Sequence, residues 1–366
     1  MRRFTVSTEV HFGAGALAML ADYRELRVFF VTDEFLVTTS FCQEAISYLP
    51  KAIVFSQVTQ EPSRRVISDG SAQYLAAEPE VVVAYGGGSV MDAAKAMHHV
   101  ALELGEGAEH GIIAVPTTSG SGSEVTSFAV ITDEQSQLKV PIVSRDLVAN
   151  VAILDPQVVV GLPAKTTADA GMDVLTHALE SYVSLGASDF SDALAEKAVK
   201  LVLEHLVQCY RHGDDLVART HMHNASCLAA MAFDNAGLGI VHSLAHALGG
   251  HFPVAHGRLN AILLPHVVAF NAEHSPVAAE RYTELGRQIA SHARGEAAIA
   301  WLLSKLKDMN RQLDIPDRLV AAGIPAQELR QLVPSLAEAA LHDGCTATNP
   351  VQPSQDDLIG ILIRAS

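Results

Sequence analysis

The chain has 366 residues, of which 49% are hydrophobic and 18% are charged, as in a folded globular protein rather than a disordered one. At the usual domain size, this length predicts two domains. The 25 basic and 41 acidic residues give a formal net charge of −16, and a field of that sign would repel a nucleic acid backbone. A small anionic cofactor stays possible, because backbone N–H groups can bind phosphate without a basic surface.

Three further features bear on the compartment. The N-terminal segment "MRRFTVSTEVHFGAGALAML" lacks the continuous apolar stretch of a signal peptide. No run approaches eighteen apolar residues, so we expect no membrane span. The four cysteines, Cys42, Cys209, Cys227 and Cys345, form no CxxC pair and suggest no disulfide framework. The sequence therefore favours a reducing compartment, and we expect a cytoplasmic protein.

The first part of the chain alternates between short strand-like segments and helical ones. Strands are predicted at 27–33, 51–56, 81–88, 111–118 and 151–156, and helices at 63–77 and 89–104. The stretches "SEVTSFAVITDE" and "LKVPIVSR" predict an appended β-hairpin. Strands that alternate with helices are typical of a parallel sheet covered on both faces, which predicts an α/β domain.

The pattern changes after Leu162 and Pro163. Ala- and Leu-rich helical periodicity continues to the end of the chain, and helices are predicted at 166–186, 190–211 and 214–236. We place the domain boundary near Gly161, with an α/β dinucleotide-binding domain at 1–161 and an all-α domain at 162–366.

Three glycines and a serine join a predicted strand to a predicted helix in "VVVAYGGGSVMDAAKAM". Gly86, Gly87 and Gly88 allow a tight turn and a close approach to a ligand, and Ser89 is predicted to cap a helix that begins near Val90. Free N–H groups and the helix dipole would favour a phosphate there. Because the pattern is not GxGxxG, a tight turn without a ligand is the alternative.

A second polar loop, "PTTSGSGSE" at 116–124, also follows a predicted strand. It supplies short hydroxyl side chains at Thr117, Thr118, Ser119, Ser121 and Ser123. Two such loops at the carboxyl ends of neighbouring strands are where a doubly wound sheet binds a nucleotide. Asp33, at the end of "RVFFVTD", is then either a ligand of the adenosine ribose hydroxyls or a helix N-cap.

Two pairs of potential metal ligands have a spacing of four residues in the helical part. Asp173 and His177 lie in "DAGMDVLTHALESY", and His242 and His246 lie in "HSLAHALGGHFPVAHG", where His256 follows in a predicted turn. Such pairs share one face of a helix, and among Gly, Ala and Leu an unpaired imidazole is costly to bury. Carboxylate and imidazole without thiolate suit Fe(II), Zn(II), Mn(II) or Co(II). We expect surface or packing roles for His98, His99, His205, His221 and His223.

Four motifs together resemble the iron-containing (group III) alcohol dehydrogenases. They are "GGGSVMDAAKA", "PTTSGSGSE", "GMDVLTHALE" and "GIVHSLAHALGGHFPVAHGRLNAILLP", and they span almost the whole chain in the family's order. The resemblance implies an N-terminal dinucleotide-binding α/β domain, like that of dehydroquinate synthase, and a C-terminal helical domain. It also implies NAD(H), a divalent metal, most often Fe(II) with Zn(II) as the alternative, and a cleft between the domains as the active site.

The resemblance also assigns roles to individual residues. It implies that the metal ligands are Asp173, His177, His242 and His256. The implied NAD contacts are Asp33, Gly87, Gly88, Ser89, Asp92, Thr117, Thr118 and Lys139, with Asp33 favouring NAD over NADP because it would repel a 2′-phosphate. His246 would lie beside the nicotinamide without binding metal and would relay a proton during metal-assisted hydride transfer, which makes it the catalytic residue.

Within the family, "ASDFSDALAEKAVKLV" and "MHNAS" are similar to the propanol dehydrogenases of propanediol-utilisation microcompartments. This likeness implies reduction of propanal to 1-propanol, a homodimer or larger assembly, and a location inside a microcompartment near its shell and lumen enzymes. Alternatives are another short-chain alcohol or diol, as in ethanolamine utilisation, a dehydroquinate synthase-like lyase, and a structural protein without activity.

Two residues depart from the family's usual pattern beside the last implied ligand. Ala255 stands where proline usually precedes that histidine, and Arg258 stands where a small or aliphatic residue is common. These changes predict either a looser turn at His256 or a positive charge near the cleft.

Overall fold

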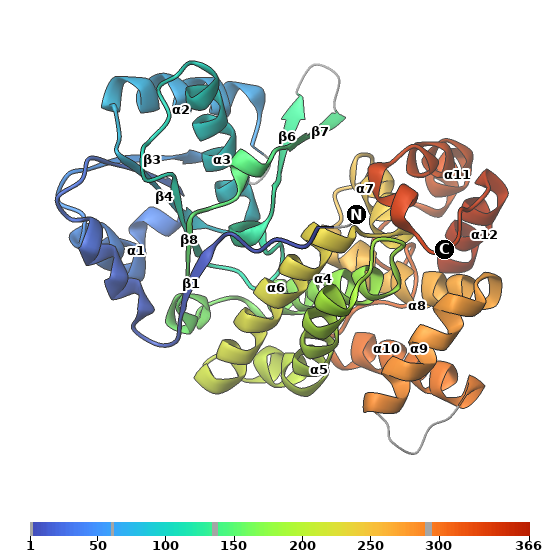
Figure 1. Ribbon diagram of the computed structural model, residues 1–366. Helices are drawn as coiled ribbons and strands as arrows, with labels where there is room; N and C mark the ends of the chain where they lie inside the picture. Colours follow the sequence, from blue (N-terminus) through green and yellow to red (C-terminus); the bar gives the residue numbers. More distant parts are fainter. Residues whose placement is uncertain (1–2, 60–61, 134–137, 290–294) are drawn as a thin grey trace. The chain divides into compact units, whose positions relative to one another are not determined.

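The computed structural model describes residues 3–59, 62–133, 138–289 and 295–366 (Figure 1). By its internal contacts the chain forms two compact units. The first, here the α/β unit, comprises Thr5–Leu162 and Asp214–Cys227. The second, the helical unit, comprises Met1–Phe4, Pro163–Gly213 and Leu228–Ser366. The assignment of separate roles to residues 1–161 and 162–366 stays a prediction.

A six-stranded parallel sheet forms the centre of the α/β unit. Its strands, in spatial order, are β1 (Glu9–Phe12), β8 (Val151–Leu154), β5 (Ile112–Pro116), β4 (Val81–Gly86), β2 (Val28–Asp33) and β3 (Ala52–Val58). The five predicted strands are thereby confirmed to within a few residues. The edge strand β1 was not predicted, because its polar–apolar alternation covers only four residues and two of them are exposed.

The order of the strands reverses at β2. From β2 the chain first adds β3 on one side and then returns to place β4, β5 and β8 on the other. In an open α/β sheet such a reversal leaves a crevice at the carboxyl ends of the two central strands, which is where ligands bind. Those ends are Asp33 on β2 and Gly86 on β4.

Alternation along β2 gives the sheet a core on each face. Phe29 and Val31 belong to one cluster, under helices α2 (Arg64–Ala77) and α3 (Gly88–Glu103). Val28 and Phe30 belong to the other, under α1 (Ser40–Ser47) and the short helix η1 (Ala16–Tyr23). All four side chains are buried, so the strand is apolar from Val28 to Val31, as expected when both faces of a parallel sheet are covered.

The predicted hairpin is confirmed. β6 (Phe128–Asp133) and β7 (Leu138–Val143) form a separate antiparallel pair, in which Ile131 lies opposite Val140. β6 contacts α3, so the hairpin extends the α/β unit beside its main sheet (Figure 1).

The helical unit is built on the long helix α4 (Ala164–Val183), which is buried on nearly all sides from Gly171 onward. The other helices are α5 (Asp189–Arg211), the end of α6 (Leu216–Ala236), α7 (Ile240–Gly249), α8 (His256–His274), α9 (Pro276–Ile289), α10 (Glu296–Gln312), α11 (Ala326–Leu341) and α12 (Gln355–Ala365). The three predicted helices of this part are confirmed as α4, α5 and α6. A Cβ at Gly171 would lie 2.2 Å from Leu206 Cδ1, so this glycine permits the close packing of α4 on α5.

A proline interrupts the hydrogen bonds of α8. Pro265 lies inside the helix and has no N–H to donate to the carbonyl of Ala261, four residues earlier. The side-chain amide of Asn310, on α10, donates to that carbonyl at 2.7 Å. A residue 49 positions away therefore supplies the hydrogen bond that the helix itself cannot make.

Within the described ranges, no single helix is long and apolar enough to cross a membrane, and only the bent pair of α6 and α7 reaches that length and composition together. All four cysteines lie in described segments, and none of them forms a disulfide.

Candidate metal and dinucleotide sites

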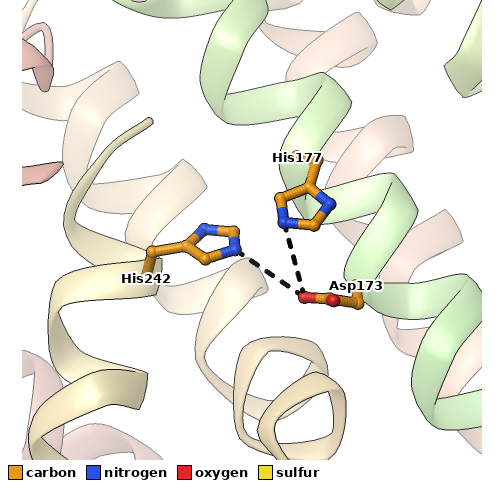
Figure 2. Close-up of side chains that lie close together, drawn as sticks. All are labelled: Asp173, His177 and His242. Carbon is orange, nitrogen blue, oxygen red and sulfur yellow. Dashed lines mark ion pairs between the residues drawn. The ribbon is translucent and has the colours of Figure 1, made fainter. Parts of the chain in front are cut away.

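Three side chains of the helical unit point toward one another from α4 and α7 (Figure 2). The Oδ1 atom of Asp173 lies 3.9 Å from His177 Nε2 and 3.7 Å from His242 Nε2. All three side chains are buried, and their ligand atoms lie within 4.8 Å of one another. The spacing of four residues between Asp173 and His177 thus places both on one face of α4, as predicted.

His256 adds a third imidazole from α8. Its Nε2 atom lies 3.7 Å from Asp173 Oδ1. The residue is the first of α8 and does not lie in a turn, so that prediction is wrong. A Cβ at Gly257 would lie 2.0 Å from the carbonyl oxygen of Asp169, so only glycine lets the start of α8 approach α4 this closely.

The two departures from the family pattern have structural explanations. Ala255 precedes α8 with φ −55° and ψ 134°, and a proline would adopt the same φ, so the turn is not loosened. Arg258 Nε donates to Asp169 Oδ1 at 2.8 Å. Its charge is therefore paired with a neighbouring carboxylate and does not stand alone.

Glu180 is a member of this cluster that the sequence analysis missed. Its Oε2 atom lies 2.5 Å from His242 Nδ1, and its Oε1 atom accepts a hydrogen bond from the N–H of Val241 at 2.7 Å. It lies seven residues after Asp173, two turns further along the same face of α4. The carboxylate fixes which nitrogen of His242 carries the proton and turns Nε2 toward Asp173. The i, i+7 spacing was the available signal.

Asn260 was also missed, and its amide lies at the centre of the cluster. Its Nδ2 atom donates to Asp173 Oδ1 at 2.7 Å and lies 3.2 Å from His242 Nε2 and 3.1 Å from His256 Nε2. The amide nitrogen has two hydrogens for these three acceptors. Its Oδ1 atom is buried without a hydrogen-bond partner among the described residues. Three lone pairs thus converge on one partly positive group.

Opposite charges within the cluster shift the pKa values of Asp173 and His242 in favour of their ionised forms. Burial would raise the pKa of Asp173, but the neighbouring His177, His242 and His256 lower it well below its usual range. Burial would lower the pKa of His242, but Glu180 and Asp173 raise it to about 9. One carboxylate and three imidazole nitrogens that converge from three helices are a donor set that suits a divalent transition metal. The residues present therefore fit the metal that the sequence implied.

His246 lies at the edge of this cluster with a carboxylate of its own. Its side chain is 42% exposed, and its Nδ1 atom lies 2.9 Å from Asp343 Oδ2. Its ring stacks on that of His256 at 5.3 Å between centroids. Burial would raise the pKa of Asp343, but the hydrogen bond and charge of His246 lower it below the usual range. Asp343, which the sequence analysis did not single out, thus stays ionised and orients His246.

In the α/β unit, the two polar loops contact each other. The N–H of Thr117 donates to the carbonyl of Gly86 at 3.0 Å. A Cβ at Gly87 would lie 3.2 Å from Thr118 Cγ2, and a Cβ at Gly88 would lie 3.0 Å from Ser121 Oγ. Glycine at 87 and 88 therefore lets the second loop lie directly against the first.

The helix after the glycines begins earlier than predicted. Gly87 is the N-cap and Gly88 the first residue of α3, so Ser89 lies inside the first turn and is not the cap. The N-cap residue is a glycine and therefore has no side chain that could cap this end. The first N–H groups of a helix have no partner within it, so this terminus is of the kind that binds phosphate.

Asp92 and His223 hold the second loop in place. Asp92 accepts hydrogen bonds from Ser123 Oγ at 2.9 Å and from the N–H of Val130 at 3.1 Å. His223 Nδ1 lies 3.0 Å from Ser119 Oγ. The resemblance gave Asp92 a contact to NAD, whereas both of its oxygens here accept hydrogen bonds from the protein. His223 is buried and has a packing role, as predicted.

Asp33 serves as a local cap. Its Oδ1 atom accepts hydrogen bonds from the N–H groups of Phe35 at 2.9 Å and Leu36 at 2.7 Å, so the capping alternative describes its contacts. Asp33 also lies at the end of β2, where a dinucleotide would bind, so its contact with the ribose stays a prediction. Lys139 lies opposite Thr132 in the hairpin, and its side chain is outside the described part of the structure.

Comparisons with known proteins match both units. Residues 7–156 match the family model of iron-containing alcohol dehydrogenase, and residues 167–366 match the C-terminal model of the Fe-containing alcohol dehydrogenase family. The chain is 41% identical to the 1-propanol dehydrogenase PduQ of Salmonella typhimurium, over 100% of this chain and 99% of that protein.

Solved structures agree. The crystal structure of a 1,3-propanediol oxidoreductase is similar with a TM-score of 0.93 and 31% identity, covering 100% of both chains. The sulfoacetaldehyde reductase from Bifidobacterium kashiwanohense, in complex with NAD+, is similar with a TM-score of 0.89 and 26% identity, covering 100% of this chain and 98% of that one.

These likenesses extend over the full length and include both the glycine loops and the histidine-rich helices. They exclude a lyase or a structural protein as the better description. The chain belongs to the iron-containing alcohol dehydrogenase family and is a metal-dependent, NAD(H)-linked alcohol dehydrogenase.

Proposed function

We propose that the enzyme reduces propanal to 1-propanol with NADH, with its metal held by Asp173, His177, His242 and His256. The observation that carries the proposal is the convergence of one carboxylate and three imidazoles on a buried point. The metal, when bound there, would polarise the aldehyde carbonyl or stabilise the alkoxide in the reverse direction.

The remaining steps belong to the side chains around the ligands. Glu180 keeps His242 in the tautomer whose Nε2 atom faces Asp173. His246, half-exposed and hydrogen-bonded to Asp343, is placed to pass a proton between the alcohol oxygen and solvent. Asp343 orients the ring of His246 through the hydrogen bond to its Nδ1 atom. NADH, when held by the glycine loops, would supply the hydride.

The dinucleotide is proposed to bind in the α/β unit at the carboxyl ends of β2 and β4. The uncapped N-terminus of α3 at Gly88 would hold the pyrophosphate. The hydroxyls of Thr117 and Thr118 would add hydrogen bonds, and Ser89, Asp92 and Lys139 complete the proposed contacts. Asp33 would select NADH, because a carboxylate at the ribose repels the 2′-phosphate of NADPH.

The choice of propanal rests on similarity. The curated relative described above is named for 1-propanol, and a structural neighbour is named for 1,3-propanediol. Both names point to three-carbon alcohols. A panel of C2 to C4 aldehydes assayed with NADH would test the choice, and a preference for ethanal or butanal would contradict it.

The metal assignment is tested with two variants and a matched control. Asp173→Ala and His242→Ala should lose the metal after anaerobic purification and should lose propanal reduction. His251→Ala removes an exposed histidine from the same stretch and should change neither metal content nor turnover. Full metal content and full turnover in Asp173→Ala would contradict the assignment.

A location inside a microcompartment and a homodimeric assembly are part of the proposal, and they rest on the resemblance. Sedimentation analysis of the metal-loaded enzyme would test the assembly. Imaging of a fluorescent fusion beside a shell protein would test the location, and a diffuse signal in cells with assembled shells would contradict it.

A further inference from the structure

A cavity in the helical unit, separate from the proposed metal ligands, is lined by basic side chains. It has a volume of about 480 Å³ and lies between α8, α10, the segment at 315–318 and the end of α12. This volume is within the range of small-ligand sites. Lys307, Arg311, Arg318 and Arg364 line it together with His266, and Asp317 is the one acidic side chain among its lining residues.

This concentration of positive charge contrasts with the rest of the chain. Four of the 25 lysines and arginines line one cavity of a protein whose formal net charge is −16. Like charges held together raise the free energy of the folded state unless a counter-charge joins them. The acidic residues of the chain do not explain why four basic side chains line the same cavity.

Most of these cations have no partner in the protein. Arg311 pairs with Asp308. Among the described residues, the side chains of Lys307, Arg318 and Arg364 form no ion pair or hydrogen bond, although Asp317 lines the same cavity. Their donors are therefore available to a bound anion.

The field of these cations acts within the cavity. Burial lowers the pKa of His266, and the charges of Lys307 and Arg364 lower it further, against the effect of Asp317. His266 is thus neutral at pH 7 and offers a hydrogen-bond donor or acceptor. Two cations of this cavity lie close enough to a partly buried ring to affect its titration.

Three apolar residues also line the cavity: Ile262 and Pro265 of α8, and Ile315. An inorganic ion would contact only the charged groups, whereas an organic group attached to the anion would also pack against these side chains. Arginine and lysine side chains that point into one cavity suit phosphate, which accepts bidentate hydrogen bonds from guanidinium and attracts ammonium as a point charge.

We propose that this cavity is a binding site for a small organic phosphate monoester, with Lys307, Arg318 and Arg364 on the phosphate and Ile262, Pro265 and Ile315 against the organic group. The site is separate from the proposed metal ligands and does not depend on the proposed reaction. Its link to them is α8, which carries Asn260 beside the metal ligands and Ile262 in the cavity wall.

The test measures binding of phenyl phosphate to the metal-loaded enzyme by titration calorimetry. Saturating NADH is present to block the proposed dinucleotide site, and ionic strength is held constant. The variant Lys307→Gln/Arg318→Gln/Arg364→Gln is compared with the control Lys200→Gln/Arg287→Gln/Arg330→Gln, which removes the same charge at exposed positions outside the cavity. Circular dichroism and thermal melting confirm the fold, and Arg364→Gln alone replaces the triple variant if that one fails to fold.

We expect wild type and control to bind phenyl phosphate with affinities within about threefold of each other. The cavity variant should bind at least 100-fold more weakly, and Arg364→Gln roughly tenfold more weakly, as for the loss of a charged hydrogen bond. Inorganic phosphate should bind more weakly than phenyl phosphate. Propanal reduction by the cavity variant should equal that of wild type. If the enzyme does not reduce propanal at all, the binding measurement still tests this proposal independently.

Four results would overturn the proposal. Phenyl phosphate could fail to bind, or it could bind the two triple variants equally, which would mean a general effect of net charge. Inorganic phosphate could bind as tightly as phenyl phosphate, which would mean an ion site only. A change of oligomeric state in the cavity variant, with no phosphate binding by wild type, would identify the surface as an interface between copies of the chain.

Discussion

The two units differ in the groups that would bind their ligands and in the environments of their buried histidines. In the α/β unit, the candidate ligand groups are main-chain N–H groups and small hydroxyls, and the buried histidines are neutral: burial lowers the pKa of His98 and of His223 to about 4. In the helical unit the outcome differs between residues: buried carboxylates raise the pKa of His242 to about 9, whereas burial lowers that of His256 to about 3. Buried histidine is a neutral packing group in one unit, and in the other its charge depends on the carboxylates beside it.

The difference follows from what each ligand demands. Phosphate is held by backbone donors at a helix terminus, so one turn of consecutive residues can supply the site. A divalent metal requires several lone pairs at one point, and no single turn can supply four. The helical unit gathers them from α4, α7 and α8, across more than eighty residues of sequence.

The largest effect expected is the loss of the charged ligand. Asp173→Asn keeps the shape of the side chain and removes its negative charge, leaving three imidazoles around an uncompensated cation. We expect metal affinity to fall roughly a thousandfold, since removal of one partner from a buried charged network is strongly unfavourable. Chelator competition measures it, and NADH affinity of the same variant should be unchanged. A fall in NADH affinity as large as that in metal affinity would show that the two units do not act separately.

The converse change is made in the glycine loop. Gly88→Val places a branched side chain against Ser121 Oγ, which lies only 3.0 Å from the position of the first added carbon. We expect NADH affinity to fall by about 10–100-fold. This corresponds to the free-energy cost of about one to three kcal/mol for forcing an extra side chain into a packed loop. Metal content should stay at the wild-type level. Fluorescence titration with NADH measures the first quantity, and equal affinity in variant and wild type would remove the loop from the proposed site.

The buried histidines predict how acid affects the α/β unit. Their folded-state pKa of about 4 lies below the usual value of 6.5. Between pH 6.5 and 4 the unfolded state therefore binds more protons than the folded state, and stability falls as pH falls. Each should contribute about 2 kcal/mol across this window.

Hydrogen exchange at β4 and β5, followed from pH 6.5 to 4.5 with correction for the intrinsic rates, measures this loss. In His98→Leu the hydrogen bond from Tyr74 to His98, 2.9 Å long, is gone, and so is one titrating group. The variant should show a shallower pH dependence than wild type whatever its absolute stability. Identical slopes would mean that His98 does not titrate in this range.

The smallest effect concerns the amide that meets three ligands. Asn260→Leu removes the hydrogen bond to Asp173 and leaves the ligand types unchanged. We expect metal affinity to fall about tenfold, within the range for residues that orient metal ligands. Chelator competition on Asn260→Leu, with thermal melting of the metal-free protein, separates lost orientation from lost packing. A variant with wild-type metal affinity and lower stability would make Asn260 a purely structural residue.

The same contrast explains what could be predicted from the sequence. The strand-to-helix turns could be predicted because apolar runs such as 81–85 end at glycines within the motif itself. The pair Asp173 and His177 could be predicted because both lie on one turn of one helix. Glu180 shares a face of α4 with Asp173, but this spacing alone does not distinguish it from any other glutamate on a helix, and only the fold places its Oε2 atom 2.5 Å from His242 Nδ1. Asn260 had no signal in the sequence, and only the fold places its amide 2.7 Å from Asp173 Oδ1.

The errors also have local causes. The cap of α3 was assigned to Ser89, since serine is the common cap, but Gly87 and Gly88 let the helix begin earlier. His256 was placed in a turn because Gly257 follows it, whereas that glycine allows helix to pack on helix. β1 is an edge strand whose alternation covers only four residues, too few to distinguish it from a loop, and its pairing with β8 defines it.

Pro265 has a consequence for how the helical unit folds. Because its ring removes one N–H, α8 cannot complete its own backbone hydrogen bonds, and the Ala261 carbonyl accepts a hydrogen bond from the side chain of Asn310 on α10. An isolated peptide with the sequence of α8 would leave that acceptor to water. The helix that carries His256 and Asn260 therefore gains this hydrogen bond only after a contact across 49 residues has formed. We expect the middle turns of α8 to become ordered together with the rest of the unit, and not before it.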